Sequence, residues 1–315
     1  MTIQERIAAA IPGGRLWRIW LERLRWAREQ AVRLVEAAGL LLAMAVFASL
    51  PVDWASGLGG FIGRTAGPRL GLSRRALRNL RQAMPENSEA ENRRILRGMW
   101  ENLCRAIAEY PHLPRIVAAS SGRVEIVNGE ALTGLAATSQ PGILFGGHLG
   151  NWEIGSSTVH RLMGASVMSV YRAANNPWVD RLMRRFHRGR RAVPKGAEGG
   201  RELVRQLRDG GSIALLVDQK QNDGIAVPFF GRDAMTAPAI ARLGSRFQCP
   251  IIPVRFERLA GARFRCTVLS PIELADTGDP ARDVLAAMTH VNAMLEDWIR
   301  ARPEQWLWVH SRWPG

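Results

Sequence analysis

"GILFGGHLGNWEIGS", from Gly142 to Ser156, joins a short apolar run to a histidine and a glutamate through a glycine-rich bend. His148 and Glu153 are five positions apart, and side chains at that spacing lie on different faces of a regular helix. Three glycines supply an irregular backbone here, because glycine adopts angles that other residues avoid and lets a ligand approach the main chain. The stretch predicts a buried strand, a tight loop and the start of a helix.

Apolar runs alternate with helical segments on both sides of this stretch. The runs that suit strands are "VEIVNG", "GILFGG", "SVMSVYR", "SIALLVDQ", "PIIPVRFERL" and "RFRCTVLSPI". Helical patterns lie around residues 177–190, 201–208 and 238–247, and a longer helical region at 73–115 precedes them. This alternation predicts an α/β fold with a mixed, mostly parallel sheet flanked by helices.

Three polar residues, His148, Arg172 and Asp218, each follow one of the apolar runs. Ligands of open α/β sheets bind beyond the carboxyl ends of the strands. An acid five positions after His148 can hold the proton of one ring nitrogen while the other nitrogen acts as a base. Backbone N–H groups from Gly147 to Gly150 are expected to face a developing oxyanion. No serine or cysteine has a comparable setting, so attack by a substrate hydroxyl that His148 activates is the simplest mechanism.

The chain of 315 residues is strongly basic, with a formal net charge of +15. Such a charge favours anionic partners: nucleic acid, anionic lipid, or an acidic protein or substrate. No zinc finger, RNP box or basic arm is found, so nucleic acid is not expected as a partner. Three widely spaced cysteines without a C-x-x-C pair suggest neither a disulfide framework nor a zinc site, and they fit a reducing compartment best.

The N-terminal region is rich in tryptophan, arginine and apolar residues. Residues 15–29, "RLWRIWLERLRWARE", form a basic amphipathic helical pattern, and residues 37–50, "AAGLLLAMAVFASL", carry no charge. Those 14 residues are fewer than the ~20 that span a bilayer. We therefore expect residues 1–60 to be an amphipathic and hydrophobic membrane anchor that lies in one leaflet, with a single span as the rival, ahead of a catalytic domain at 61–315.

The segment "GGHLGNWEIG" resembles the H-x-x-x-x-[DE] box of glycerolipid-type acyltransferases, in the form used by the bacterial lipid A biosynthesis (late, Kdo-lipid A) acyltransferase family. Three further segments resemble that family in the same order along the chain: "VYRAANNPWVD", "LLVDQKQNDGIAVPFFGRDAMT" and "PEQWLWVHSRW". The likeness runs from about Leu77 to Trp313.

The resemblance implies transfer of a fatty acyl chain from acyl carrier protein to a hydroxyl of a lipid A precursor, with no other cofactor and no metal. It makes His148 the general base and Glu153 its orienting acid. The substrate-binding residues that it implies are Arg172, Asp218, Asn151 and Gly147. Arg172 would hold an anionic group, and Asp218 would position the acceptor or Arg172. The enzyme would meet inner-membrane lipids at the cytoplasmic face of the cell inner membrane.

Several alternatives stay open on the sequence. The enzyme could acylate another glycolipid or a phospholipid, or the chain could be a basic nucleic-acid-binding protein. A metal hydrolase with His148 and Glu153 as ligands would need a third ligand, which the sequence does not offer nearby. The "FFG" segment at 229–231 would either line an acyl groove or pack in the core, and the tryptophans of the C-terminal segment would either contact the membrane or pack in the core.

Overall fold

The computed structural model describes residues 14–186 and 190–313. These residues belong to two compact units, Met1–Val46 with Ala174–His187, and Phe47–Ala173 with Arg188–Gly315. The boundary after Val46 lies ahead of residue 60, because helix α3 (Val52–Ala66) packs on helix α5 (Glu89–Glu109) of the larger unit. The function of the N-terminal residues as an anchor stays a prediction.

The smaller unit contains most of one long helix, α2 (Gly14–Ser49). The expected amphipathic segment and apolar run are therefore parts of a single continuous helix. Its 31 residues from Ile19 to Ser49 are long and apolar enough to cross a membrane, by length and composition. A second helix, α9 (Pro177–Phe186), follows Asn176, whose side-chain amide donates to the Arg33 carbonyl at 2.7 Å.

The larger unit is built on a seven-stranded sheet, which confirms the predicted fold class. In spatial order the strands are β1 (Val124–Val127), β9 (Arg263–Val268), β8 (Ile251–Ala260), β2 (Ile143–Gly146), β5 (Ser212–Leu216), β3 (Val167–Tyr171) and β4 (Ala192–Pro194). Neighbouring strands are parallel except β8 and β9. A separate antiparallel hairpin, β6 (Ile225–Phe229) and β7 (Arg232–Thr236), was not predicted.

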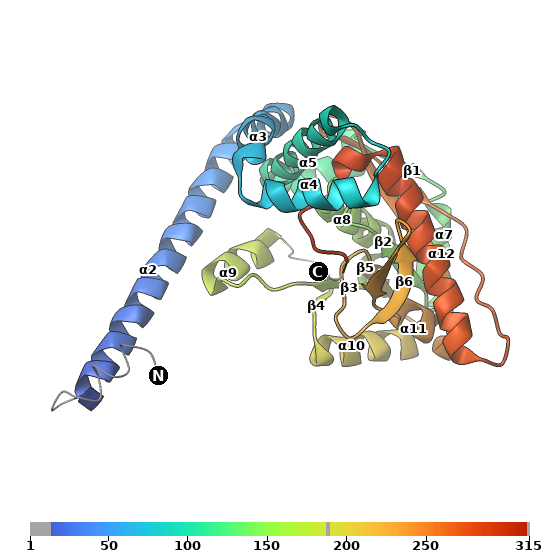
Figure 1. The fold of residues 1–315 in the computed structure, drawn as a ribbon. Coiled ribbons are helices and arrows are strands. Elements are labelled where there is room, and N and C mark those ends of the chain that lie inside the picture. The colour runs from blue at the N-terminus through green and yellow to red at the C-terminus, as the bar shows by residue number, and fades with distance from the viewer. Residues whose placement is uncertain (1–13, 187–189, 314–315) are drawn as a thin grey trace. The chain divides into compact units, whose positions relative to one another are not determined.

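Helices cover both faces of the sheet (Figure 1). The alternation of side chains along β2 shows the two layers, since Ile143 and Phe145 enter one core cluster and Leu144 enters the other. The helices of the first cluster are α4 (Leu72–Ala83), α5, α10 (Ala197–Arg208), α11 (Ala239–Phe247) and α12 (Pro280–Ala301). Those of the second are α6 (Leu113–Val117), α7 (Glu130–Thr138) and α8 (Trp152–Met163).

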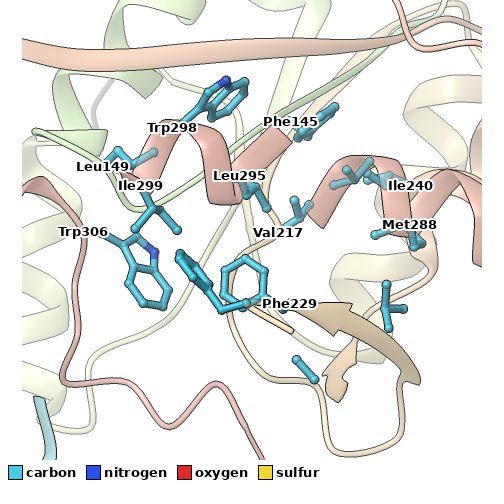
Figure 2. Packing of buried hydrophobic residues seen from close by; sticks show 14 of the residues in the cluster. Phe145, Leu149, Val217, Phe229, Ile240, Met288, Leu295, Trp298, Ile299 and Trp306 are labelled. Atoms are coloured by element: carbon cyan, nitrogen blue, oxygen red, sulfur yellow. The ribbon is translucent and has the colours of Figure 1, made fainter. Parts of the chain in front are cut away.

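Aromatic side chains fill the core beside α12. In Figure 2, Leu295, Trp298 and Ile299 of this helix belong to the same cluster as Phe145 of β2. The rings of Phe145 and Trp298 stack with centroids 6.2 Å apart. The three C-terminal tryptophans and both phenylalanines of the hairpin turn are buried in the same cluster: Trp306, Trp308, Trp313, Phe229 and Phe230. Packing in the core is thus the correct alternative for these segments, and membrane contact by the tryptophans is wrong.

Candidate active site

Two adjacent strands bring His148 and Asp218 to one edge of the sheet. Strand β2 ends at Gly146, and β5 ends at Leu216, which is its register partner. Each strand is followed within two residues by a polar side chain, His148 after β2 and Asp218 after β5. Because the two strands are parallel, their carboxyl ends meet, and residues that lie 70 positions apart become neighbours.

His148 and Asp218 form a directly hydrogen-bonded pair. Nδ1 of His148 lies 2.7 Å from Oδ1 of Asp218, and the indole N–H of Trp306 donates to Oδ2 at 2.7 Å. Burial raises the pKa of Asp218, but the charge of His148 and these hydrogen bonds outweigh it and hold the pKa well below its ordinary 3.8. The carboxylate therefore accepts the Nδ1 proton, which leaves Nε2 as the basic nitrogen. The side chain of His148 is 15% exposed and that of Asp218 is 2% exposed, so the base is the accessible member.

Nδ1 of His148, the atom that Glu153 was expected to hold, lies 2.7 Å from Asp218. Glu153 lies in the first turn of α8, where its Oε2 atom is 3.2 Å from Nη2 of Arg190. Burial, and then the charge of Glu153, raise the pKa of Tyr110, which places that phenol near the same carboxylate. Asp218 therefore holds the Nδ1 atom of His148 in place of Glu153. A catalytic role for Glu153 stays a prediction.

Gln219 and His310 also reach His148, and sequence reasoning missed both. The side-chain nitrogen of Gln219 lies 3.3 Å from Nε2 of His148 and 3.3 Å from Nε2 of His310. One amide group has two hydrogens, so it can donate to both imidazoles at once. Gln219 directly follows Asp218 in the "VDQ" segment, and His310 lies in "WVHSRW". Both segments carry the family resemblance, so this resemblance is the signal that could have identified the two residues.

Three backbone N–H groups of the loop, those of His148, Leu149 and Gly150, are already engaged inside the protein. The N–H of His148 donates to Oδ2 of Asp218 at 2.8 Å. The N–H of Leu149 donates to the Gly147 carbonyl, and that of Gly150 donates to the Gln305 carbonyl. The expected oxyanion site from the 147–150 backbone therefore does not hold for these three groups, and for the N–H of Gly147 it stays a prediction. The Gln219 amide is a side-chain donor that lies beside the base instead.

Asn151 positions the loop through a buried polar network. Its Oδ1 atom accepts from the first backbone N–H groups of α8, and its Nδ2 atom donates to Oε2 of Glu109 at 2.8 Å. Glu109 is fully buried and paired with Arg258, whose Nη2 atom donates to Oε2 at 3.0 Å, while Ser56 donates to Oε1 at 2.7 Å. Both ends of the Asn151 amide are thus engaged inside the protein. A contact between Asn151 and substrate stays a prediction.

The other two predicted substrate residues lie differently. Gly147 is buried beneath the pair, and a Cβ atom there would approach Oδ2 of Asp218 to 3.4 Å and Leu295 to 3.1 Å. Arg172 is exposed and directly follows β3. Burial is the largest cause that lowers the pKa of His310, and the positive charges of Arg172 and Arg75 add to it. Arg172 therefore lies within electrostatic reach of the site, as does Arg75, which sequence reasoning missed.

Metal ligation finds no support in this arrangement. Within residues 14–186 and 190–313, no group of three or more His, Cys, Asp or Glu side chains is placed to hold a metal ion. The groups around His148 are a carboxylate, an amide, a second imidazole and more distant arginines. Such a set suits proton transfer from a hydroxyl better than coordination of a cation.

Comparison with known proteins identifies the reaction class. The family model described as "Bacterial lipid A biosynthesis acyltransferase" matches residues 28–314. The chain belongs to this family. It is therefore an acyltransferase, and the His148–Asp218 pair lies in the family's matched region.

Individual relatives of the family cover most of the chain. The lipid A biosynthesis myristoyltransferase of Escherichia coli (strain K12) is 28% identical over 291 residues, which are 87% of this chain and 86% of the relative. The lipid A biosynthesis acyltransferase 1 of Shigella flexneri matches to the same extent. The lipid A biosynthesis lauroyltransferase of Escherichia coli (strain K12) is 24% identical over 249 residues, 75% of this chain and 76% of the relative.

Proposed function

We propose that this acyltransferase moves a fatty acyl chain from acyl carrier protein to a hydroxyl of a lipid A precursor, at the cytoplasmic face of the inner membrane. The observation that carries the proposal is the His148–Asp218 pair, which keeps one imidazole nitrogen basic and accessible in a chain of this family. The names of the relatives, a myristoyltransferase and a lauroyltransferase, support a saturated fatty acyl group as the donor chain.

The chemistry needs one base that later returns its proton. The acceptor hydroxyl takes the place of the Gln219 amide at Nε2 of His148, while Nδ1–H stays bonded to Asp218. As the hydroxyl oxygen bonds to the thioester carbonyl carbon, its proton moves to Nε2 and the carbonyl oxygen becomes an oxyanion. Collapse of this intermediate breaks the carbon–sulfur bond, and His148 gives the proton to the departing thiolate. The Gln219 amide, once displaced from Nε2, is free to donate a hydrogen bond to the oxyanion.

Positive charge around the site supports substrates of the opposite sign. Arg172 and Arg75 both act on His310 electrostatically, and the whole chain carries +15. Lipid A precursors carry phosphates, and acyl carrier proteins are acidic, so both fit this charge. The contribution of surface charge to recruitment falls as salt screens it.

Mass spectrometry of lipid A from cells with and without the protein tests the acceptor and the chain length together. The proposal predicts loss of one secondary acyl chain from lipid A in the deletion strain, restored by the wild-type gene and not by His148→Ala. Purified enzyme is then assayed with acyl-acyl carrier protein and with acyl-CoA at two salt concentrations. We expect a preference for the carrier protein and a KM for it that rises with salt. Unchanged lipid A, or equal use of acyl-CoA at both salt concentrations, would contradict the proposal.

A further inference from the structure

We infer that the exposed face of α3 is a lipid-contacting surface of the catalytic unit, which docks on an anionic bilayer. This inference rests on the proposed membrane location but concerns the unit that carries His148 rather than helix α2. Four apolar side chains form the exposed stripe of α3: Trp54 (73% exposed), Leu58 (40%), Phe61 (56%) and Ile62 (44%). Among the described residues, Trp54 exposes the largest fraction of any large hydrophobic side chain.

The opposite face of α3 is fixed to the protein by glycines. Gly59 and Gly63 lie so close to α5 that a Cβ atom would meet Ala108 Cβ at 2.6 Å and the Trp100 carbonyl oxygen at 2.2 Å, respectively. Ser56 on the same face donates to Glu109. Figure 1 shows α3 beside α5. The helix cannot rotate its apolar stripe inward without losing these contacts. The packing of α3 on α5 therefore keeps the stripe exposed.

The apolar surface continues past α3 into the start of α4. Between them lies the short 3-10 helix η1 (Gly67–Arg69), and Leu70 and Leu72 next to it are 49% and 47% exposed. Ser73 holds this turn by donating to the Gly67 carbonyl, and it accepts from the Trp100 indole. Six of the nine exposed large hydrophobic residues described in the larger unit lie between residues 54 and 72. Such clustering marks an interaction surface rather than scattered exposure.

The charges of the same segment select the partner. Residues 52–78 contain five arginines and one acidic residue, Asp53, which is paired with Arg123. Arg69 donates to the Thr65 carbonyl at the end of the exposed stripe. Within residues 14–186 and 190–313, no ion pair is found for four of these arginines: Arg69, Arg74, Arg75 and Arg78. Apolar side chains flanked by unpaired arginines fit the interface of an anionic bilayer, where the arginine heads meet phosphates.

Chain connectivity supports the same occupant. Helix α2, which is long and apolar enough to cross a membrane, ends at Ser49, and α3 begins at Val52. If α2 enters a bilayer, the start of α3 must lie at that bilayer's surface. Burial is the main cause that lowers the pKa of His310, and the charge of Arg75 adds to it, so one arginine of this surface lies within electrostatic reach of the active site.

Fluorescent labelling of the full-length chain in vesicles tests this surface. Leu58→Cys, the test position, and Leu285→Cys, its control, are each labelled with an environment-sensitive maleimide dye. The two leucines are matched in exposure, at 40% and 43%. The labelled wild type measures the background from the native cysteines. The proteins are reconstituted into phosphatidylcholine vesicles with and without phosphatidylglycerol, and nitroxide-labelled lipid is added as a quencher. At position 58 we expect vesicles to shift the dye emission to the blue and nitroxide lipid to quench it, and both changes should be larger with phosphatidylglycerol. At position 285 we expect neither change.

The outcomes separate this inference from the proposed function. Equal quenching at both positions in protein that sediments with vesicles would overturn the α3 surface while leaving membrane attachment intact. A dye at position 58 that is shielded but not quenched by nitroxide lipid would show that protein, such as a second copy of the chain, covers the face, and would also overturn it. Acyl transfer to a lipid A precursor is measured on the same samples, so failure of the proposed function is read independently.

Discussion

His148 and Asp218 are joined at two points, since the backbone N–H of His148 donates to one carboxylate oxygen at 2.8 Å and Nδ1 lies 2.7 Å from the other. The two contacts fix both the position of the loop and the plane of the ring. Trp306 supplies a third hydrogen bond to the same carboxylate. One buried aspartate therefore sets the tautomer, the orientation and the placement of the base, which makes its replacement informative.

Asp218→Asn should lower kcat by about 10²–10⁴-fold, because an amide can present a donor to Nδ1 and favour the wrong tautomer. Loss of the negative charge also disfavours protonated imidazole, so the acidic limb of the pH–rate profile should move to lower pH. Glu153→Gln should leave that limb in place, since its carboxylate pairs with Arg190. Full pH–rate profiles of both variants check this, and a limb that moves in Glu153→Gln but not in Asp218→Asn would restore Glu153 as the orienting acid.

Gln219→Glu should reduce activity at neutral pH and recover it under alkaline conditions. The new carboxylate would face the Nε2 atoms of both His148 and His310 and favour their protonated forms, so the base becomes available only at higher pH. Gln219→Leu removes the donor without adding charge and should stay slow at every pH. The comparison is made by measuring kcat across neutral and alkaline pH, and identical profiles for the two variants would show that Gln219 does not face the base.

His310→Asn should flatten the dependence of stability on pH. Burial, and then the neighbouring positive charges, lower the pKa of His310 below its ordinary 6.5 in the folded state. The unfolded chain therefore binds more protons at this site than the folded chain near and below pH 6.5. Folding stability falls as the pH drops from 6.5 through the lowered pKa of His310 in the folded state. The melting temperature of the wild type should decrease more steeply over this range than that of His310→Asn. Parallel curves would count against a buried neutral His310.

Gly150→Ala should cost activity beyond its effect on stability. Gly150 has φ +57°, and a Cβ atom there would lie 3.1 Å from the Arg258 nitrogen and 3.3 Å from Gln305. Gly122 has a similar φ of +60° with no atom within 4 Å, so Gly122→Ala is a matched control for backbone strain. Each variant should lose about 1–2 kcal/mol of unfolding free energy from the left-handed backbone. Only Gly150→Ala should also lose kcat, and equal kcat in the two variants would show that the loop tolerates the shift.

The sheet could be predicted from the sequence because each of its main strands is a short apolar run bounded by polar or glycine-rich segments. The predicted runs became β1, β2, β3, β5, β8 and β9. Helix α12 was missed, although Asp279 and Pro280 at its start are an ordinary capping signal. The β6–β7 hairpin gave no such signal, because its turn places Phe230, a residue unusual at positive φ, in the left-handed region. Contact with the Phe229 ring and a hydrogen bond from the Phe230 N–H to Glu296 stabilise this turn.

Sequence reasoning named His148 and Asp218 but not the contact between them, and it missed Gln219 and His310. Local spacing linked His148 to Glu153, whereas the contact with Asp218 depends on β2 and β5 being neighbours in the sheet. Strand order is a property of long-range packing, which a single sequence does not show. The same holds for His310, which reaches the site only because the C-terminal segment folds back over it and bridges Leu149 to Trp306.

The central claim is that His148 is the base, and the rate of acyl transfer by purified His148→Ala tests it most directly. The measurement uses an acyl-acyl carrier protein and a lipid A precursor, with thermal unfolding recorded on the same samples and His290→Ala, at an exposed position on α12, as the control. We predict that His148→Ala falls by about 10²–10⁴-fold in kcat with an unchanged melting temperature, while His290→Ala matches the wild type. Transfer by folded His148→Ala at a rate near that of the wild type would contradict the claim.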